Sequence, residues 1–261
     1  MGNSQSKKEL ARKIVAVIPS RYASTRFEGK PLANILGKPM IQWVCERVRA
    51  CSALSDVIVA TDDRRIADAV LRFGGKAVMT SPENRSGTDR AAEAAAILSL
   101  GLEDIVINVQ GDQPMIHPRC LEEVSEPFFT DPEVVMSTLA FAIVEPNEIA
   151  NPKDVKVVID RNGYALYFSR SPIPCGRDPE TLFTTYKHLG IYAYTRRFLD
   201  IFRYLPEGDL ERIEKLEQLR ALENGHRIRV VVSSHDSPEV DQPEDIIRIE
   251  KLLRKDRSLS L

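Results

Sequence analysis

One run of residues most constrains how this chain can fold: Ile-Val-Ile-Asn-Val at positions 105–109. Consecutive β-branched and aliphatic residues are typical of a strand buried on both faces of a parallel sheet. The run ends in Gln110-Gly111-Asp112-Gln113-Pro114, where polar and turn-forming residues take over. Ligands of open α/β sheets bind beyond the carboxyl ends of the strands. Asp112 is therefore expected to meet a ligand or a metal there, or else to cap the turn before Pro114.

Similar apolar runs alternate with helix-like segments through the first half of the chain. Strands are predicted at 14–18, 57–60, 76–79, 105–109 and 134–142. The segments between them predict helices that begin near residues 39, 64, 88 and 118. This alternation is typical of an α/β fold with a doubly wound, mostly parallel sheet. We assign one α/β domain to residues 13–254, because 261 residues are ample for a large core.

The pattern changes after residue 150. Runs at 155–160 and 165–169 flank Asn162-Gly163, and Asn-Gly between two strand-like runs predicts a hairpin. Hairpins do not belong to a doubly wound core, so a small inserted β-lobe is predicted at about 150–195. A strand at 188–194 is expected to return to the sheet.

The last third of the chain predicts one long helix, a strand and a closing helix. Residues 210–224 have helical periodicity and stop at Gly225. The buried stripe of this helix is expected to contain Ile213, Leu216, Leu219 and Leu222. A last core strand is predicted at 228–232, and Asp241 lies near the start of the closing helix.

Composition excludes several classes of partner. The net charge of −2 offers no electrostatic reason for nucleic-acid binding. No apolar run approaches the roughly 20 residues of a membrane span. The four cysteines show no metal-ligand spacing, and we interpret them as reduced residues of a cytoplasmic protein. Residues 1–12 are interpreted as a disordered polar tail, although their beginning formally matches a myristoylation pattern.

The loop after the first strand predicts phosphate binding. Its sequence at 19–30 is Pro-Ser-Arg-Tyr-Ala-Ser-Thr-Arg-Phe-Glu-Gly-Lys. Backbone N–H groups, hydroxyls and cations at a strand end suit a polyphosphate. The loop is neither a GxGxxG nor a Walker A motif. The alternative is a solvated basic loop.

Three further features predict metal-assisted transfer of a phosphoryl or nucleotidyl group. Ser86-Gly87-Thr88 begins the Ala-rich helix, where Ser86 or Thr88 either caps the helix or contacts an anion or base. Asp112 and Asp241 each follow a core strand, so both carboxylates are expected at one sheet edge. Mg²⁺ typically uses one or two carboxylates plus substrate phosphates. We recognise no Ser/His/Asp or Cys/His combination in the sequence that would supply a catalytic nucleophile.

At these residues the sequence resembles the bacterial 3-deoxy-manno-octulosonate cytidylyltransferase family. The resemblance covers about residues 13–250, and its ordered set of motifs is specific although each motif alone is weak. The motifs are Ile18–Arg26 with Gly29-Lys30-Pro31-Leu32, Ala60-Thr61-Asp62, Ser86-Gly87-Thr88-Asp89-Arg90, Asn108–Asp112, Asn151-Pro152, Val155–Val158, Tyr164–Arg170, His188–Tyr192, Leu216–Arg220 and Val240–Asp245.

The resemblance implies an activity, a fold and a set of roles. The implied reaction converts CTP and 3-deoxy-D-manno-octulosonate to CMP-sugar and pyrophosphate for lipopolysaccharide synthesis. The implied enzyme is a Mg²⁺-dependent homodimer of the cytoplasm. Its implied fold is nucleotide-diphospho-sugar-transferase-like. The implied nucleotide-binding residues are Pro19, Ser20, Arg21, Ser24, Thr25, Arg26, Lys30, Ser86, Gly87, Thr88 and Gln110. The implied metal ligands are Asp112 and Asp241, and the catalytic residues are Asp112, Lys30 and Arg21. The implied sugar-binding residues are Gln110, His188, Tyr192, Glu214 and Gln218.

Spacing agrees with two of the implied sugar pairs. His188 and Tyr192 are four apart on a predicted strand, so they share a face. Glu214 and Gln218 are four apart on a predicted helix, so they are also expected to share a face. The alternative is that the strand pair fills the sheet surface and the helix pair is solvated.

Two residues depart from the family pattern. Glu28 places a negative charge in the phosphate loop, which weakens nucleotide binding unless the side chain points outward. Gln113 stands where glutamate is common, so a role given to that glutamate is in doubt here. The rival interpretations are a CMP-sialate synthetase or another acid-sugar cytidylyltransferase, and a non-catalytic nucleotide-binding paralogue.

Overall fold

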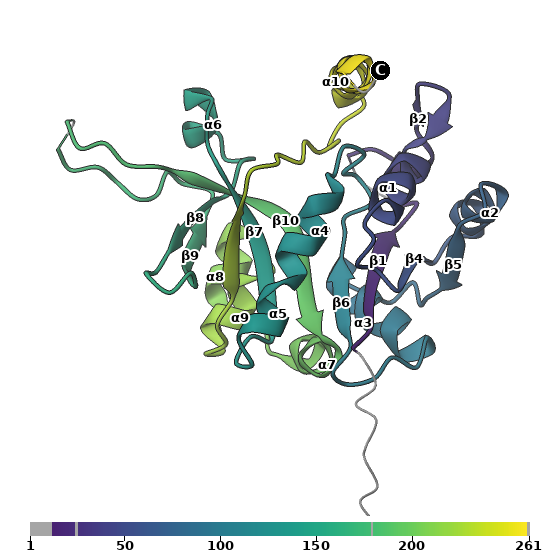
Figure 1. The fold of residues 1–261 in the computed structure, drawn as a ribbon, viewed down its shortest axis with the longest axis horizontal. Helices are drawn as coiled ribbons and strands as arrows, with labels where there is room; N and C mark the ends of the chain where they lie inside the picture. Colours follow the sequence, from purple (N-terminus) through teal and green to yellow (C-terminus); the bar gives the residue numbers. More distant parts are fainter. Residues whose placement is uncertain (1–11, 24–25, 179, 260–261) are drawn as a thin grey trace, which may run out of the picture.

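The main sheet has seven strands in one path of hydrogen-bonded neighbours among the described residues (Figure 1). From edge to edge they are β11 (Arg229–Ser233), β7 (Met136–Ala142), β10 (Tyr186–Thr195), β6 (Ile105–Asn108), β1 (Ile14–Ser20), β4 (Asp56–Thr61) and β5 (Lys76–Met79). Only β10 is antiparallel to its neighbours on this path. The predicted α/β class with a mostly parallel sheet is confirmed.

The computed structural model describes residues 12–23, 26–178 and 180–259, with side chains up to Asp256. Residues 1–11, which make up most of the predicted tail, therefore lie outside the described residues, as do Ser24 and Thr25 of the phosphate loop. None of the described helices combines the length and apolar character needed to span a membrane.

Strand β1 shows why the sheet is buried on both faces. Ile14, Ala16 and Ile18 belong to one core cluster. Val15 and Val17 belong to the other. Successive strand side chains point to opposite faces, so a continuous aliphatic run supplies both cores at once.

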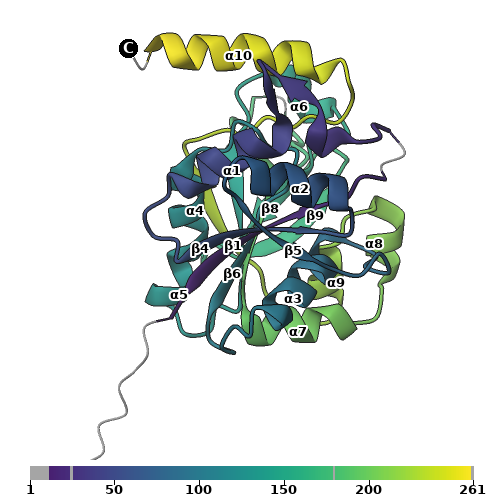
Figure 2. The ribbon, with the colours of Figure 1, turned by 90° about the vertical axis from the view of Figure 1, so that its right-hand side faces the viewer.

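Helices cover both faces of the sheet (Figure 2). Those on one face are α1 (Met40–Arg49), α2 (Arg64–Arg72), α4 (Pro118–Ser125) and α5 (Pro127–Thr130). Those on the other are α3 (Gly87–Ile97), α7 (Arg196–Tyr204) and α9 (Leu219–Glu223). The remaining elements are η1 (Lys30–Leu32), β2 (Asn34–Ile35), β3 (Lys38–Pro39), α6 (Pro146–Ala150), α8 (Asp209–Glu214) and α10 (Asp245–Leu259).

The predicted hairpin consists of β8 (Lys156–Ile159) and β9 (Ala165–Ser169). Gly163 in its turn has φ 79°, which glycine adopts without steric cost. β8 also pairs with β10 at Tyr186 and Lys187, so the hairpin continues from the main sheet. The predicted strand at 188–194 is confirmed as β10, which lies between β7 and β6 in the middle of the sheet.

The prediction of one long helix over 210–224 is wrong. Lys215 has left-handed backbone geometry, and it separates α8 from α9. The Arg170 Nε donates to the carbonyl oxygen of Glu214 at 2.7 Å, an oxygen that a continuous helix would offer to residue 218. The predicted buried stripe also fails at Ile213, which is 76% exposed. A tertiary contact has overridden local periodicity.

The C-terminal part of the chain returns over the first half. Ile249 and Leu253 of α10 pack with Ile35, Met40 and Val240 in a third core cluster. Figure 2 shows α10 lying above α1 at the edge of the molecule. This packing places the residues just before α10 beside the carboxyl ends of the central strands.

Candidate active site

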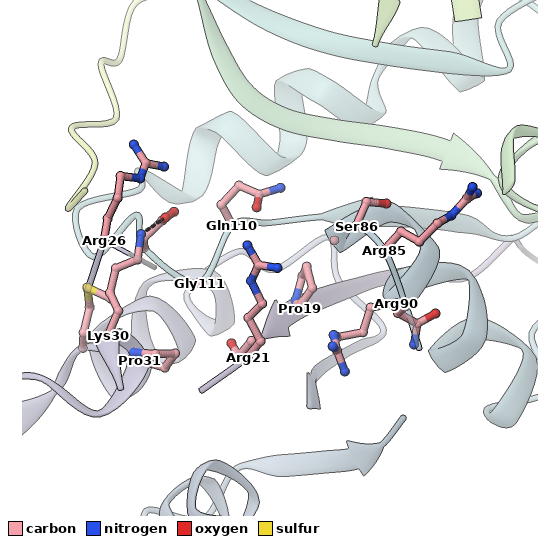
Figure 3. A pocket seen from close by; sticks show the side chains of 15 residues that line it. Pro19, Arg21, Arg26, Lys30, Pro31, Arg85, Ser86, Arg90, Gln110 and Gly111 are labelled. Carbon is pink, nitrogen blue, oxygen red and sulfur yellow. Dashed lines mark hydrogen bonds and ion pairs between the residues drawn. The ribbon is translucent and has the colours of Figure 1, made fainter. Parts of the chain in front are cut away.

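A pocket lies beyond the carboxyl ends of β1 and β6 (Figure 3). It combines the loop after β1, the start of α3 and the turn after β6. Its lining residues are Pro19, Ser20, Arg21, Arg26, Lys30, Pro31, Met40, Asn84, Arg85, Ser86, Gly87, Arg90, Gln110, Gly111 and Asp112. We call this the first pocket. The strand-end placement predicted for these segments is confirmed.

The loop after β1 folds back on itself before η1. Gly29 has φ 67°, and its N–H donates to the carbonyl oxygen of Tyr22 at 2.9 Å. Arg21 and Arg26 are exposed and line the pocket. Figure 3 shows cationic side chains at both ends of it, with Arg21 and Gln110 between them. Glu28 is exposed and does not line the first pocket, so its charge points outward.

Two glycines allow the loops to approach closely. A Cβ on Gly111 would lie 2.7 Å from Ser20 Oγ and 3.2 Å from the backbone oxygen of Pro19. A Cβ on Gly87 would lie 3.2 Å from Pro19 Cγ. A side chain at either position would therefore press against the end of β1, more severely at Gly111 than at Gly87.

The start of α3 carries a polar cluster. Ser86 Oγ accepts a hydrogen bond from the N–H of Asp89 at 3.1 Å, which confirms it as the helix cap. Ser86 and Thr88 both donate to the Glu217 carboxylate, at 2.7 and 3.0 Å. Burial raises the pKa of Glu217 above its ordinary value. Thr88 is 2% exposed and lies beneath the pocket rather than lining it.

Arg90 lines the same end of the first pocket and was not among the predicted site residues. It is 4% exposed and is held by Thr80 at 2.6 Å and Asp62 at 2.9 Å. The signal was present in the sequence, because Asp62 follows β4 and Arg90 lies one helical turn after Ser86.

Asp112 and Asp241 are brought together by segments far apart in the chain. The N–H of Val240 donates to the carbonyl oxygen of Asp112 at 3.0 Å. Lys30 Nζ donates to the Asp112 carboxylate at 2.6 Å and to the carbonyl oxygen of Val240 at 2.9 Å. Asp241 is 3.3 Å from Arg26. Each aspartate thus has one cationic partner from the phosphate loop.

A third carboxylate, Glu239, lies beside this pair and was missed by sequence reasoning. Burial and the negative charges of Asp112 and Asp241 raise its pKa to about 7. Gln113 Nε2 donates to Glu239 Oε1 at 2.9 Å. Nothing in the local sequence around Glu239 indicates this position, because only the packing of α10 brings it to Asp112.

A second pocket adjoins the first through Arg26, which lines both. It is formed by the amino end of β10, the region around α6 and the segment before α10. Its lining residues are Arg26, Asn147, Glu148, Asn151, Lys153, Asp154, Val155, Arg170, Lys187, His188, Leu189, Gly190, Asp236, Ser237, Pro238, Glu239, Asp241, Asp245 and Arg248.

His188 lines the second pocket as a neutral imidazole. Burial lowers the pKa of His188 to about 3. Its Nε2 is 2.9 Å from Thr138 Oγ1, a hydroxyl that itself donates to the carbonyl oxygen of Ile191 at 2.7 Å. The hydroxyl therefore accepts from the Nε2–H, which leaves Nδ1 as the acceptor nitrogen of the ring.

The other implied sugar residues are placed differently. Tyr192 shares a strand face with His188, as predicted, with ring centroids 5.3 Å apart, but it lines neither pocket. Glu214 accepts from Ser169 Oγ and from the N–H of Arg170, and Gln218 is buried. The expected shared helix face of Glu214 and Gln218 is wrong, because the helix breaks between them. Gln110 lines the first pocket.

The donor set at Asp112 and Asp241 fits Mg²⁺. Both are hard oxygen ligands, and their negative charges add to burial in raising the pKa of Glu239. Within the described part of the chain, no group of three or more His, Cys, Asp or Glu side chains forms a complete metal cage. Mg²⁺ is usually bound by one or two protein carboxylates when substrate oxygens supply further ligands, and this pair matches that pattern.

Comparison with known proteins identifies the family. A cytidylyltransferase family model matches residues 15–228. A 3-deoxy-manno-octulosonate cytidylyltransferase of Desulfosudis oleivorans is 64% identical, over 92% of this chain and 97% of that protein. This chain belongs to the 3-deoxy-manno-octulosonate cytidylyltransferase family.

Other members of the 3-deoxy-manno-octulosonate cytidylyltransferase family bear on substrate and fold. An 8-amino-3,8-dideoxy-manno-octulosonate cytidylyltransferase of Shewanella frigidimarina is 55% identical, over 94% of this chain and 100% of that protein. The solved structure of a CMP:2-keto-3-deoxy-manno-octonic acid synthetase complexed with CTP has a TM-score of 0.88 and 45% identity, covering 94% and 99% of the two chains. The predicted fold and family are therefore confirmed.

Proposed function

We propose that this protein is a Mg²⁺-dependent 3-deoxy-D-manno-octulosonate cytidylyltransferase that forms CMP-sugar and pyrophosphate from CTP and the sugar. One observation carries the proposal: a cationic pocket and a polar pocket meet where Asp112 and Asp241 lie together. The relatives named for this activity support the choice of sugar.

The first pocket suits CTP. Arg21, Arg26 and Lys30 offset the charge of the triphosphate and of the leaving pyrophosphate. Ser86 lies at the far end of the pocket from Lys30 in Figure 3, and we propose it as a base contact together with Gly87, which also lines the pocket. Ser24 and Thr25 are proposed as additional triphosphate contacts on the resemblance alone.

The second pocket suits a polyhydroxylated acid. His188 Nδ1 accepts a hydroxyl hydrogen, and Arg170 and Lys153 line the same cavity as cations. In the reaction, the anomeric hydroxyl oxygen bonds to the α-phosphorus while the bond from that phosphorus to the bridging oxygen breaks. Pyrophosphate leaves and the hydroxyl proton passes to solvent. Mg²⁺ held by Asp112 and Asp241 would lower the pKa of that hydroxyl.

Pyrophosphate release from CTP tests the proposal. The assay uses 3-deoxy-manno-octulosonate, its 8-amino analogue, sialate and no sugar, each with and without EDTA. We expect release with 3-deoxy-manno-octulosonate and its loss with EDTA. A preference for the 8-amino analogue or for sialate would change the assigned sugar, and no release with any sugar would indicate a binding protein.

We also propose that the protein is a homodimer acting in the cytoplasm for lipopolysaccharide synthesis. Val144, Leu182 and Phe183 are exposed hydrophobic residues. Their two segments lie together, because the N–H of Ile143 donates to the carbonyl oxygen of Thr185. Figure 1 shows the segment between β9 and β10 extending away from the body of the sheet. Light scattering of Leu182→Asp against the unmodified chain tests this dimer surface.

A further inference from the structure

A hydrogen-bonded pair, buried Gln113 and exposed Glu239, lies at the junction of the two pockets. Gln113 is 0% exposed, and its Nε2 donates to Glu239 Oε1 at 2.9 Å. Glu239 has accessible surface and lines the second pocket, whereas Gln113 lines neither pocket. The amide therefore holds the carboxylate from behind and leaves it facing the cavity.

The backbone around Glu239 is also fixed. The N–H of Val240 donates to the carbonyl oxygen of Asp112 at 3.0 Å, and Lys30 Nζ donates to the carbonyl oxygen of Val240 at 2.9 Å. These two bonds flank the Gln113–Glu239 bond and tie the same segment to the turn after β6. Glu239 is consequently held in one direction by both main-chain and side-chain contacts.

The Glu239 carboxylate borders the second pocket and lies close to the backbone of β10. Gly190 of β10 faces it, and a Cβ there would lie 3.4 Å from Glu239 Oε1 and 3.9 Å from both Gln110 Cγ and Gln113 Nε2. Because Gly190 carries no side chain, the strand approaches the carboxylate closely, and Glu239 still lines the second pocket. Gln110, which also lies near Gly190, lines the first pocket, so Glu239 lies where the two pockets meet.

The other carboxylates on this side of the second pocket are already paired. Asp241 faces Arg26, and Asp236 and Glu148 share Lys187 at 2.9 and 2.8 Å. Among the described residues, the Glu239 carboxylate accepts a hydrogen bond only from the neutral amide of Gln113, which leaves acceptor capacity for a ligand. A carboxylate repels an acid group, so the ligand group suited to it is a hydroxyl.

We propose that Glu239 is a substrate-binding residue that accepts a hydroxyl hydrogen of the sugar, and that Gln113 is the residue that positions it. The inference rests on the proposed function and deepens it by naming a contact of the sugar. A hydroxyl bound to a carboxylate makes a charge-assisted hydrogen bond.

The first test is Glu239→Gln, which keeps the shape of the side chain and removes its charge. We expect the KM for the sugar to rise roughly 10- to 150-fold, as for loss of a charge-assisted hydrogen bond, with CTP binding and melting temperature little changed. Glu244→Gln, an exposed residue of the same segment that lines neither pocket, is the matched control. An unchanged sugar KM for Glu239→Gln would overturn the proposal.

The exchange variant Gln113→Glu/Glu239→Gln distinguishes sugar binding by Glu239 from a purely structural role of the Gln113–Glu239 pair. It restores the hydrogen bond and the total charge but puts the carboxylate at the buried position. We expect its melting temperature to recover relative to Gln113→Glu, while its sugar KM stays raised. Recovery of both the melting temperature and the sugar KM would show that the pair only stabilises the structure.

Two further measurements complete the test. Sugars lacking single hydroxyls should include one that binds worse to the unmodified protein but no worse to Glu239→Gln. If Glu239→Gln instead weakens Mn²⁺ binding measured by electron paramagnetic resonance and saturating Mn²⁺ restores the sugar KM, Glu239 acts on the metal and the sugar contact is wrong. If the unmodified protein uses no sugar at all, the proposed function itself has failed.

Discussion

The two pockets share a wall but are built in opposite ways. The first pocket is formed by segments that each follow a strand of the parallel part of the sheet or begin a helix. The second is formed by the antiparallel strand β10, the region around α6 and the segment before α10. Its residues from 147 to 248 follow no common local pattern.

This difference explains why the first pocket could be predicted from the sequence and the second could not. In a parallel sheet the residues just after each strand meet at one edge, so reading strand ends finds them. In the second pocket, residues meet because long segments return across the sheet. Four predictions test whether the two pockets work as separate units joined at the aspartates.

The largest effect is expected at the junction. Asp112→Asn and Asp241→Asn should each lower turnover by about 100-fold or more, because the proposed metal serves the attacking hydroxyl, while CTP affinity changes far less. Steady-state kinetics at saturating Mg²⁺ and CTP titration measure the two effects. Glu28→Gln, an exposed carboxylate of the phosphate loop, is the control. Near-normal turnover in both variants would contradict the metal assignment.

The next effect should be confined to the first pocket. Arg21→Ala removes one charge-assisted phosphate contact worth about 1.5–3 kcal/mol, so CTP should bind roughly 10- to 150-fold more weakly. Sugar affinity measured without nucleotide should stay the same. Arg119→Ala, which removes an exposed arginine paired with Glu122, controls for net charge. Equal CTP titration curves for Arg21→Ala and the unmodified protein would remove Arg21 from the site.

A smaller effect is expected from the close approach of two loops. Gly111→Ala would place its Cβ 2.7 Å from Ser20 Oγ, so the free energy of unfolding should fall by about 1–3 kcal/mol. Urea denaturation measures this loss. Adding Ser20→Ala removes the nearest atom and should recover part of it. No recovery in the double variant would show that the strain lies elsewhere.

The smallest effect, taken over one pH unit, concerns the second pocket and the pH dependence of stability. The pKa of His188 is lowered to about 3 in the folded protein, against an ordinary value of 6.5. Between these values the unfolded chain binds the extra proton, so stability falls as pH falls, by at most about 1.4 kcal/mol per pH unit. His188→Gln should flatten the stability profile in this range. An equally steep profile in the variant would contradict a buried, neutral His188.

The sequence by itself determined much of the first pocket. Aliphatic runs predicted the strands, and the polar residues after them predicted Arg21, Lys30 and Asp112 at one edge. Ser86 and Thr88 were the two candidate caps of α3, and the structure shows that Ser86 is the cap. These predictions succeed because the physical cause is local: a strand that buries both faces must place its polar residues at its end.

Only the tertiary structure decided the features that depend on distant partners. Arg170 breaks the predicted helix at Lys215, because its guanidinium binds a carbonyl that the helix would have used. Ser86 and Thr88 donate to Glu217, which lies far away in the sequence. The packing of α10 brings Glu239 to Asp112, beside the Asp241 that the sequence already placed at this edge. Side-chain partners separated by more than a hundred residues leave no periodic trace in the sequence, so packing alone sets which groups meet.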